Sequence, residues 1–233
     1  MQQPPIPIPE EIIDKFENIE RLLDVTYGPR VLRASRDPIS ELIGTILSQN
    51  TSDTNTSRSM ATLRERFPTW QHVRDAATVD IVDAIRSGGL ANRKAPRIQA
   101  VLEEVVARQG DTDLTFLAGM PLEEAKAWLT SMNGIGPKTA ACVLLFSLGR
   151  PAMPVDTHVG RVMARLGVVP DRTSTITKER ILETLIGPDP DTVYAIHVET
   201  IEHGRRICRA QRPKCPECPL REYCDYYNEH CLA

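Results

Sequence analysis

Apolar residues recur at three- and four-residue spacings along most of the chain. One such face predicts a helix that begins at Glu10, and it consists of Ile12, Ile13, Phe16, Ile19, Leu22 and Leu23. Asp37 and Pro38 predict another helix start, with a capping side chain before a proline in the first turn. Further helical patterns cover residues 54–67, 80–86, 93–108, 122–131, 138–148, 157–166, 178–185 and 192–208. Glycine or proline separates most of these segments, and no stretch alternates as a strand would, so the pattern predicts an all-α protein of about ten helices.

The charges nearly balance over the whole chain but not along it. Among 233 residues, 28 Lys and Arg stand against 31 Asp and Glu, a formal net charge of -3, whereas nucleic-acid-binding domains usually carry a basic excess. Residues 204–221 nevertheless hold six basic residues and one acid, Glu217. These basic residues are Arg205, Arg206, Arg209, Arg212, Lys214 and Arg221. They form either a solvated surface or a surface that contacts phosphate.

The ends of the chain carry little chemistry. Residues 2–9 contain four prolines and no periodic apolar pattern, so residues 1–9 are predicted to form a mobile arm. No segment is apolar over the roughly 18 residues that a membrane helix needs, and the N-terminus lacks the apolar region of a secretion signal. We therefore expect a cytoplasmic protein with no membrane partner.

Four of the six cysteines lie close together in the sequence. Cys208, Cys215, Cys218 and Cys224 are separated by six, two and five residues, with prolines between them. In a chain without a secretion signal, such a cluster indicates metal ligation before disulfides. A structural zinc ion and a [4Fe–4S] cluster both take four thiolates, although zinc sites usually combine two short cysteine pairs and this segment has one. Cys142 and Cys231 are interpreted as plain thiols.

Residues 132–139 predict a very tight turn between two helices. Gly134 and Gly136 permit close approach of another backbone, and Pro137 presets the first turn of the next helix, whose N-terminus attracts phosphate. An ordinary helix–helix turn is the alternative. Lys138, at the second helical position, opposes the helix dipole. Partial burial would favour its neutral amine, a nucleophile that can form a Schiff base, whereas a charged Lys138 would contact phosphate.

Asp156 follows that lysine by 18 residues and precedes another helical pattern. Its simplest role is to cap this helix. A capping aspartate remains ionised, so the same carboxylate could stabilise a cationic sugar in a transition state. His158 is interpreted as a packing residue and not as a base.

Together these motifs resemble the endonuclease III family of DNA repair glycosylases, in the helix-hairpin-helix, Gly/Pro-rich loop, Asp superfamily. The similarity covers the chain from about Glu10 to Tyr226. It rests on residues 134–140, on residues 155–158, on His203-Gly204-Arg205 and on the six-two-five spacing of the cysteines.

The resemblance implies two helical domains with a DNA-binding cleft between them. Residues 31–150 would form a six-helix barrel with the helix-hairpin-helix at about 122–148, and residues 10–30 with 151–233 would form the cluster domain. The family implies a [4Fe–4S] cluster held by the four clustered cysteines and DNA contacts from Gly134, Gly136 and Arg205. It implies that Lys138 attacks C1′ of the damaged nucleotide while Asp156 stabilises the developing positive charge. The expected partner is double-stranded DNA with oxidised pyrimidines or abasic sites, bound by a monomer near the nucleoid.

Two loop positions relate to base extrusion in the family. Residues 47–53 match the segment in which the family usually places a glutamine that fills the gap left by the flipped base. This chain has Asn50 at that position, with Gln49 beside it, and asparagine is shorter by one methylene. Leu90 matches the family's apolar wedge, and its flanking glycines predict an exposed loop tip, whereas a core contact is the alternative.

Three other functions are alternatives to this one. An adenine-mismatch glycosylase would have a catalytic glutamate at Thr45 and no lysine at position 138, so both positions disagree with it. A thymine-mismatch glycosylase stays open as an alternative, because only the residues of the base pocket distinguish it from an enzyme for oxidised pyrimidines. A non-enzymatic iron–sulfur or DNA-binding protein would require Lys138 and Asp156 to be incidental.

Overall fold

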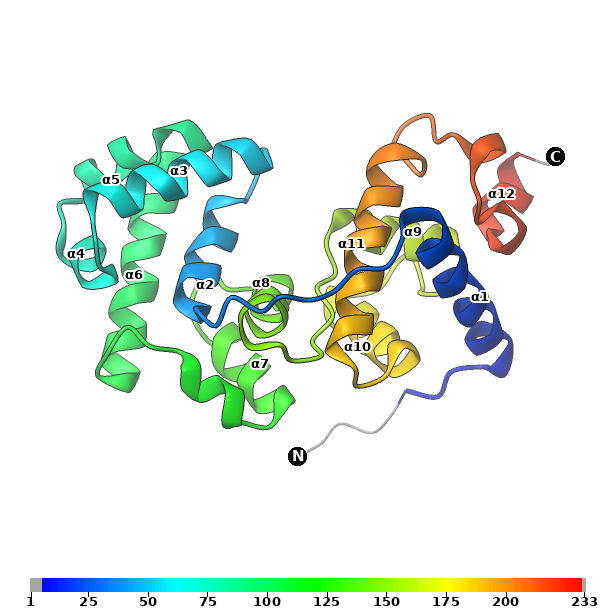
Figure 1. The fold of residues 1–233 in the computed structure, drawn as a ribbon, viewed down its shortest axis with the longest axis horizontal. Helices are drawn as coiled ribbons and strands as arrows, with labels where there is room; N and C mark the ends of the chain where they lie inside the picture. The colour runs from blue at the N-terminus through cyan, green and yellow to red at the C-terminus, as the bar shows by residue number, and fades with distance from the viewer. Residues whose placement is uncertain (1–5, 232–233) are drawn as a thin grey trace. The chain divides into compact units, whose positions relative to one another are not determined.

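The protein is built from helices that form two compact units. The structure, a computed structural model, describes residues 6–231, and every regular element among them is helical (Figure 1). This confirms the all-α prediction. One unit combines Met1–Arg33 with Gly149–Ala233 and is called the terminal unit, and the other spans Ala34–Leu148 and is called the central unit.

The central unit is organised around a helix that is apolar on almost every side. Helix α2 (Pro38–Leu47) begins as predicted, since the Asp37 side chain accepts a hydrogen bond from Ser40 N and Pro38 occupies the first turn. It packs against α3, α6, α8 and η3. Its buried apolar residues include Ile39, Leu42, Ile43, Ile46 and Leu47. Each such side chain contributes roughly 1.5–3 kcal/mol by leaving water, so α2 anchors the loops attached to it.

The remaining elements of the central unit pack on α2 or on one another. They are α3 (Asp53–Arg66), α4 (Trp70–Asp75), α5 (Thr78–Ala84), η1 (Arg86–Gly88), α6 (Ala91–Gln109), η2 (Thr115–Gly119), α7 (Leu122–Thr130), α8 (Pro137–Cys142) and the π-helical turn η3 (Val143–Ser147). The helix predicted for residues 138–148 is therefore wound in two ways, α-helical at its start and π-helical at its end.

The terminal unit places two helices side by side at its centre. Helix α9 (Thr157–Arg165) packs on α11 (Pro190–Arg206), and the contact is tight at Gly204. A side chain there would meet His158 Nδ1 at 3.0 Å and Arg161 Nη2 at 3.1 Å. The other elements are α1 (Glu10–Tyr27), α10 (Thr175–Ile186), η4 (Cys215–Glu217), η5 (Arg221–Tyr223) and α12 (Asp225–His230).

The predicted proline-rich arm is described in part. Residues 6–9 line a groove together with Gly167, Val168, Val169 and Pro170, and residues 1–5 lie outside the described part of the chain. No helix within residues 6–231 is both long and apolar enough to cross a membrane.

Candidate active site and cysteine cluster

The predicted hairpin joins α7 to α8, and its two glycines differ in what they do. Gly134 has a φ of +83°, and a side chain there would lie 2.7 Å from Arg97 Nε, so the fold itself requires glycine. Gly136 has a φ of −94° and is exposed, and a side chain there would meet nothing within 4 Å. The protein's own packing therefore gives no reason for glycine at position 136. A close approach by an external group would give such a reason.

Lys138 is the second residue of α8 and is half-buried. Pro137 occupies the first helical position, as predicted, and Gly136 caps the helix without a side-chain hydrogen bond. The amine of Lys138 thus follows directly after the exposed hairpin. This arrangement suits a group that reacts with, or binds to, something that approaches Gly136.

A carboxylate in the central unit interacts with Lys138 and was not singled out in the sequence. Glu41 lies on α2, which packs against α8. Burial raises the pKa of Glu41, while the charge of Lys138 and a hydrogen bond from Thr45 act to lower it. The Thr45 hydroxyl lies 3.5 Å from Glu41 Oε1. Glu41 is the one charged residue of the largely apolar segment 39–47, and this was the signal that could have identified it.

Asp156 caps α9, which confirms the structural role predicted for it. Its Oδ1 atom accepts hydrogen bonds from His158 N and Val159 N, each 2.8 Å long. Both bonds engage the same oxygen of the carboxylate. Asp156 also lines a pocket with Gly160, Arg161 and Lys178. Asp156 belongs to the terminal unit and Lys138 to the central unit.

His158 has the packing role that the sequence predicts. Its Nδ1 atom lies 3.1 Å from Arg161 Nη2, which also donates to Gly204 O at 3.0 Å. The histidine therefore sits in the tight contact between α9 and α11. The predicted contact residue Arg205 follows Gly204 and is exposed.

The two loops predicted to act in base extrusion both contain a left-handed residue. Asn50 has a φ of 54° and is exposed, and Leu90 has a φ of 52° with 45% of its surface exposed. The left-handed conformation costs a residue with a side chain roughly 1–2 kcal/mol. Because 45% of its surface is exposed, Leu90 lies at a loop tip, as predicted, and not in the core. Gln49 is half-buried, and its Oε1 accepts a hydrogen bond from Arg97 Nη1 at 3.2 Å.

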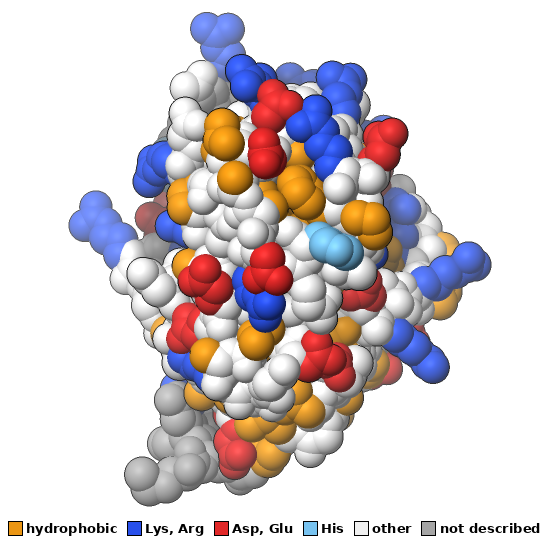
Figure 2. Space-filling view, turned by 90° about the vertical axis from the view of Figure 1, so that its left-hand side faces the viewer, with side chains coloured by type: hydrophobic (Ala, Val, Ile, Leu, Met, Phe, Trp, Pro, Cys, Tyr) orange, Lys and Arg blue, Asp and Glu red, His pale blue; other side chains and the backbone are white. Residues whose placement is uncertain are grey.

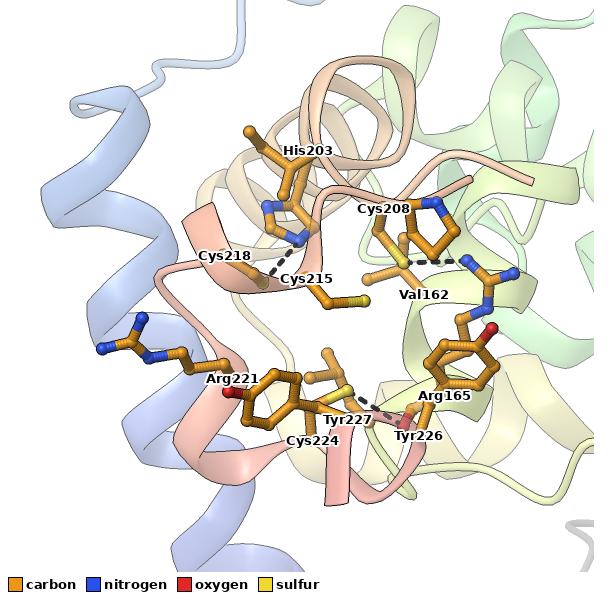
Figure 3. Close-up of a pocket in the computed structure, with 13 residues that line it drawn as sticks. Val162, Arg165, His203, Cys208, Cys215, Cys218, Arg221, Cys224, Tyr226 and Tyr227 are labelled. Carbon is orange, nitrogen blue, oxygen red and sulfur yellow. Dashed lines mark hydrogen bonds between the residues drawn. The ribbon is translucent and has the colours of Figure 1, made fainter. Parts of the chain in front are cut away.

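The four clustered cysteines line one cavity of the terminal unit (Figure 3). The empty volume is about 360 Å³ when the space open to solvent is included, and Val162, Leu166, Ile207 and Tyr226 contribute to the cavity wall. Cys208, Cys215, Cys218 and Cys224 come from residues 207–224, which we call the cysteine loop. None of the six cysteines, all within the described residues, forms a disulfide.

Nitrogen donors face two of these sulfurs. Arg165 Nη1 lies 3.4 Å from Cys208 Sγ, and His203 Nε2 lies 3.5 Å from Cys218 Sγ (Figure 3). Burial lowers the pKa of His203 to about 4, so its ring is neutral. Tyr27 OH lies 2.8 Å from His203 Nδ1. A hydroxyl that donates to Nδ1 leaves Nε2–H to point at the sulfur.

Among the described residues, the four thiols do not converge on a site for a single metal ion. A zinc ion bound by four thiolates needs sulfurs about 3.8 Å apart, given its bond length to sulfur. Across residues 6–231, no three side chains of the metal-binding types lie close enough to hold one ion. Burial raises the pKa of Cys218 to about 12 and that of Cys215 to about 11, so thiolates here require a cationic partner. Sulfurs spread around a cavity suit an iron–sulfur cluster.

A fifth cysteine lies beside the cluster site. Cys231, predicted to be a plain thiol, forms a side-chain hydrogen bond with Cys215 that contributes to the raised pKa of Cys215. Cys231 follows α12, which packs against α9. The sequence carried no signal for this contact, because it depends on how α12 folds back.

The basic residues of segment 204–221 are all exposed. Some are held by the cysteine loop itself, since Arg221 Nη1 donates to Pro216 O at 2.8 Å. By contrast, the face of the molecule drawn in Figure 2 mixes acidic and basic side chains, so no field of one sign covers it. A local basic surface on this segment thus explains how a chain of net charge -3 can present positive charge to a polyanion.

Two family models match this chain. Residues 43–202 match the HhH-GPD superfamily base excision DNA repair protein. Residues 208–224 match the iron-sulfur binding domain of endonuclease III. The second match begins at Cys208 and ends at Cys224, and it confirms the predicted iron–sulfur cluster.

The chain is also similar to relatives and solved structures that are named Endonuclease III. The chain is 37% identical to Endonuclease III of Thermotoga maritima over 192 residues, which cover 82% of this chain and 84% of the relative. It is similar to the structure of a non-covalent Endonuclease III–DNA complex, with a TM-score of 0.78, 27% identity and coverage of 95% and 99% of the two chains. It is also similar to a trapped Endonuclease III–DNA covalent intermediate, with a TM-score of 0.78, 28% identity and coverage of 93% and 97%.

Proposed function

The chain belongs to the HhH-GPD superfamily of base excision DNA repair proteins, and from this premise we propose that it is a bifunctional DNA glycosylase and AP lyase. Its substrate would be double-stranded DNA that carries oxidised pyrimidines or abasic sites. The enzyme would act as a monomer, in the cytoplasm near the nucleoid.

One observation carries the lyase half of this proposal. Lys138 follows directly after the exposed hairpin, where Gly136 leaves open space for an approaching backbone. A similar structure is titled a trapped covalent intermediate of Endonuclease III with DNA. Covalent trapping requires a nucleophile, and the amine of Lys138 would supply one at this position.

In the proposed reaction, the neutral amine of Lys138 attacks C1′ and the bond from C1′ to the base breaks. The base leaves with the bonding electrons and takes up a proton. The C1′–O4′ bond then breaks and O4′ takes up a proton, which opens the sugar ring to a Schiff base. C2′ loses a proton, the C3′–O bond breaks and the 3′ phosphate leaves, so the strand is nicked 3′ to the lesion. Water finally hydrolyses the Schiff base and restores the amine. The Asp156 carboxylate stabilises the positive charge that develops on the sugar.

The remaining site residues serve binding. Gly134 and Gly136 present backbone N–H groups to phosphate, and Arg205 adds positive charge. Cys208, Cys215, Cys218 and Cys224 would hold a [4Fe–4S] cluster. When bound, that cluster cross-links the cysteine loop and so supports the basic residues on it.

Borohydride trapping on a duplex with one abasic site tests the proposal. We expect a covalent protein–DNA adduct that disappears in Lys138→Ala, because the Schiff base is lost. Lys126→Ala is the matched control, since Lys126 lies in the same unit and pairs with Glu123 on α7. An adduct undiminished in Lys138→Ala would refute the assignment of the nucleophile.

The substrate class needs a separate experiment. We expect release of oxidised pyrimidines from a panel of duplexes, whereas excision of thymine from a mismatch alone would favour a mismatch glycosylase. Varying the base opposite the lesion tests Asn50. Because asparagine is shorter than glutamine, we expect Asn50→Gln to change the preference for that base.

A further inference from the structure

A buried lysine lies between the two loops predicted to act in base extrusion. Lys94, in the first turns of α6, is 3% exposed. Its Nζ atom donates to Leu47 O at 2.7 Å and to Gly88 O at 2.9 Å. Leu47 ends α2, three residues before Asn50, and Gly88 ends η1, two residues before Leu90. One ammonium group thus connects both loops.

This placement opposes the ordinary behaviour of lysine. Burial lowers the pKa of Lys94, since the charged form is moved out of water. Both acceptors are backbone carbonyls, which carry partial charges only. An apolar side chain of the same length would fill this space without the cost of burying a charge. Packing alone therefore does not account for lysine at position 94.

The loop before α6 is shaped by further contacts. A side chain at Gly88 would lie 2.7 Å from Ser59 Oγ, so Gly88 is seated directly on α3. Gly89 has a φ of +66° and Leu90 a φ of 52°, so two successive residues are left-handed. The result is a loop whose base is fixed and whose tip, Leu90, is exposed.

One turn further along α6, Arg97 makes a second pair of connections. It donates to Gln49 Oε1 at 3.2 Å, and its side chain lies against Gly134 of the hairpin. Residues three apart on a helix share a face, so Lys94 and Arg97 act side by side. Helix α6 therefore contacts all three predicted DNA-facing segments of the central unit through two cations.

We propose that Lys94 is a positioning residue for base extrusion, which ties the Asn50 loop and the Leu90 loop into one rigid wedge. The inference rests on the proposed function, because it assigns a role within base flipping. An extruded nucleotide leaves a gap that must be filled while the neighbouring step is held open. Two loops that share one buried cation keep a constant separation, so both enter the duplex in a single event.

The test compares Lys94→Met with Lys126→Met, the same substitution on α7 of the same unit, where the lysine pairs with Glu123. Methionine keeps the length of the chain but cannot donate to Leu47 O and Gly88 O. We expect Lys94→Met to slow base release from lesion duplex roughly tenfold to a hundredfold, as displacement of positioning groups does. A 2-aminopurine reporter beside the lesion should show the same loss of extrusion. Lys126→Met should behave as the unmodified protein.

Two further measurements separate positioning from mere stability. Circular dichroism and thermal unfolding establish that Lys94→Met is folded, and Lys94→Arg, which keeps donors and charge, should recover part of the rate. In a double-mutant cycle with Leu90→Ala, we expect the double variant to be no slower than the slower single variant, because both changes disable one wedge. Additive losses would overturn the proposal and make Lys94 a structural anchor.

The abasic substrate distinguishes failure of this inference from failure of the proposed function. Trapping on a preformed abasic site requires Lys138 but no extrusion of a base, so Lys94→Met should still trap. If the unmodified protein does not trap, the lyase assignment fails. If the unmodified protein traps and releases bases, and Lys94→Met traps and releases bases at the same rates, the positioning role of Lys94 is refuted.

Discussion

The central unit and the cysteine loop present candidate DNA-binding residues on different kinds of support. The loops of the central unit are attached to α2 and α6, which bury apolar residues along their lengths. The elements η4, η5 and α12, all within the described residues, contain no buried residue, and Leu220 and Cys224 between them are buried. A hydrophobic core thus supports one region, while thiols around a cavity support the other. A region without its own core depends on its cofactor for folding.

Loss of the cluster should have the largest effect and should be confined to one region. We expect Cys218→Ala to abolish the visible absorbance of the cluster and to weaken DNA binding by about a hundredfold or more, since the basic surface loses its support. Hydrogen exchange should show lost protection in the cysteine loop and unchanged protection in α2 and α6. Exchange that rises equally in both regions would contradict the comparison. Cys142→Ala, in the central unit, serves as the control.

The two hairpin glycines should separate folding from binding. Gly134→Ala forces a left-handed alanine against Arg97, so we expect a loss of about 2 kcal/mol in the free energy of unfolding. Gly136→Ala meets nothing within 4 Å, so stability should stay within about 0.5 kcal/mol.

For Gly136→Ala the loss should appear in DNA affinity, by about tenfold, because the added methyl keeps phosphate away from the backbone. Denaturant unfolding and a salt titration of binding measure the two effects. Equal stability losses at both positions would mean that Gly136 serves the fold.

Glu41→Gln should give the smallest effect, and one that depends on pH. Burial raises the pKa of Glu41 in the folded protein above its unfolded value, so the folded state binds more protons and stability falls as pH rises through this window. Glutamine cannot ionise, so this loss of stability at high pH disappears in Glu41→Gln. We expect a Tm about 2 °C higher at pH 8 and no gain at about pH 3, where the carboxyl is almost fully protonated in both states.

The same substitution should alter the reaction. The charge of Lys138 acts to lower the pKa of Glu41, so the two groups interact electrostatically, and glutamine removes this interaction. In Glu41→Gln, the acid limb of the pH–rate profile for trapping should shift to lower pH. Asp37→Asn is a weaker control, because Asp37 also acts on Glu41 but caps α2. A profile that does not move would show that Glu41 and Lys138 are uncoupled in the reaction.

Local chemistry could be predicted from the sequence where neighbours along the chain determine it. The caps at Asp37 and Asp156 were predictable because a side chain and the next few N–H groups form each cap. The hairpin was predictable because glycines and Pro137 act within one turn. The π-helical turn after Cys142 was not predictable, since a run of apolar residues has the same pattern in an α-helix and in a π-helix. Glu41 and Cys231 were not recognised, because their partners lie on other elements.

The sequence by itself determined the helical architecture, the cysteine spacing and the identity of Lys138 and Asp156 as candidates, because periodicity, caps and ligand spacing are properties of neighbouring residues. Only the tertiary structure decided that Lys94 would be buried between two loops, that Arg97 would lie on Gly134, and that the four sulfurs would surround a cavity. These features arise when segments far apart in the chain pack together. Burial then changes the cost of a charge, and no local pattern encodes that cost.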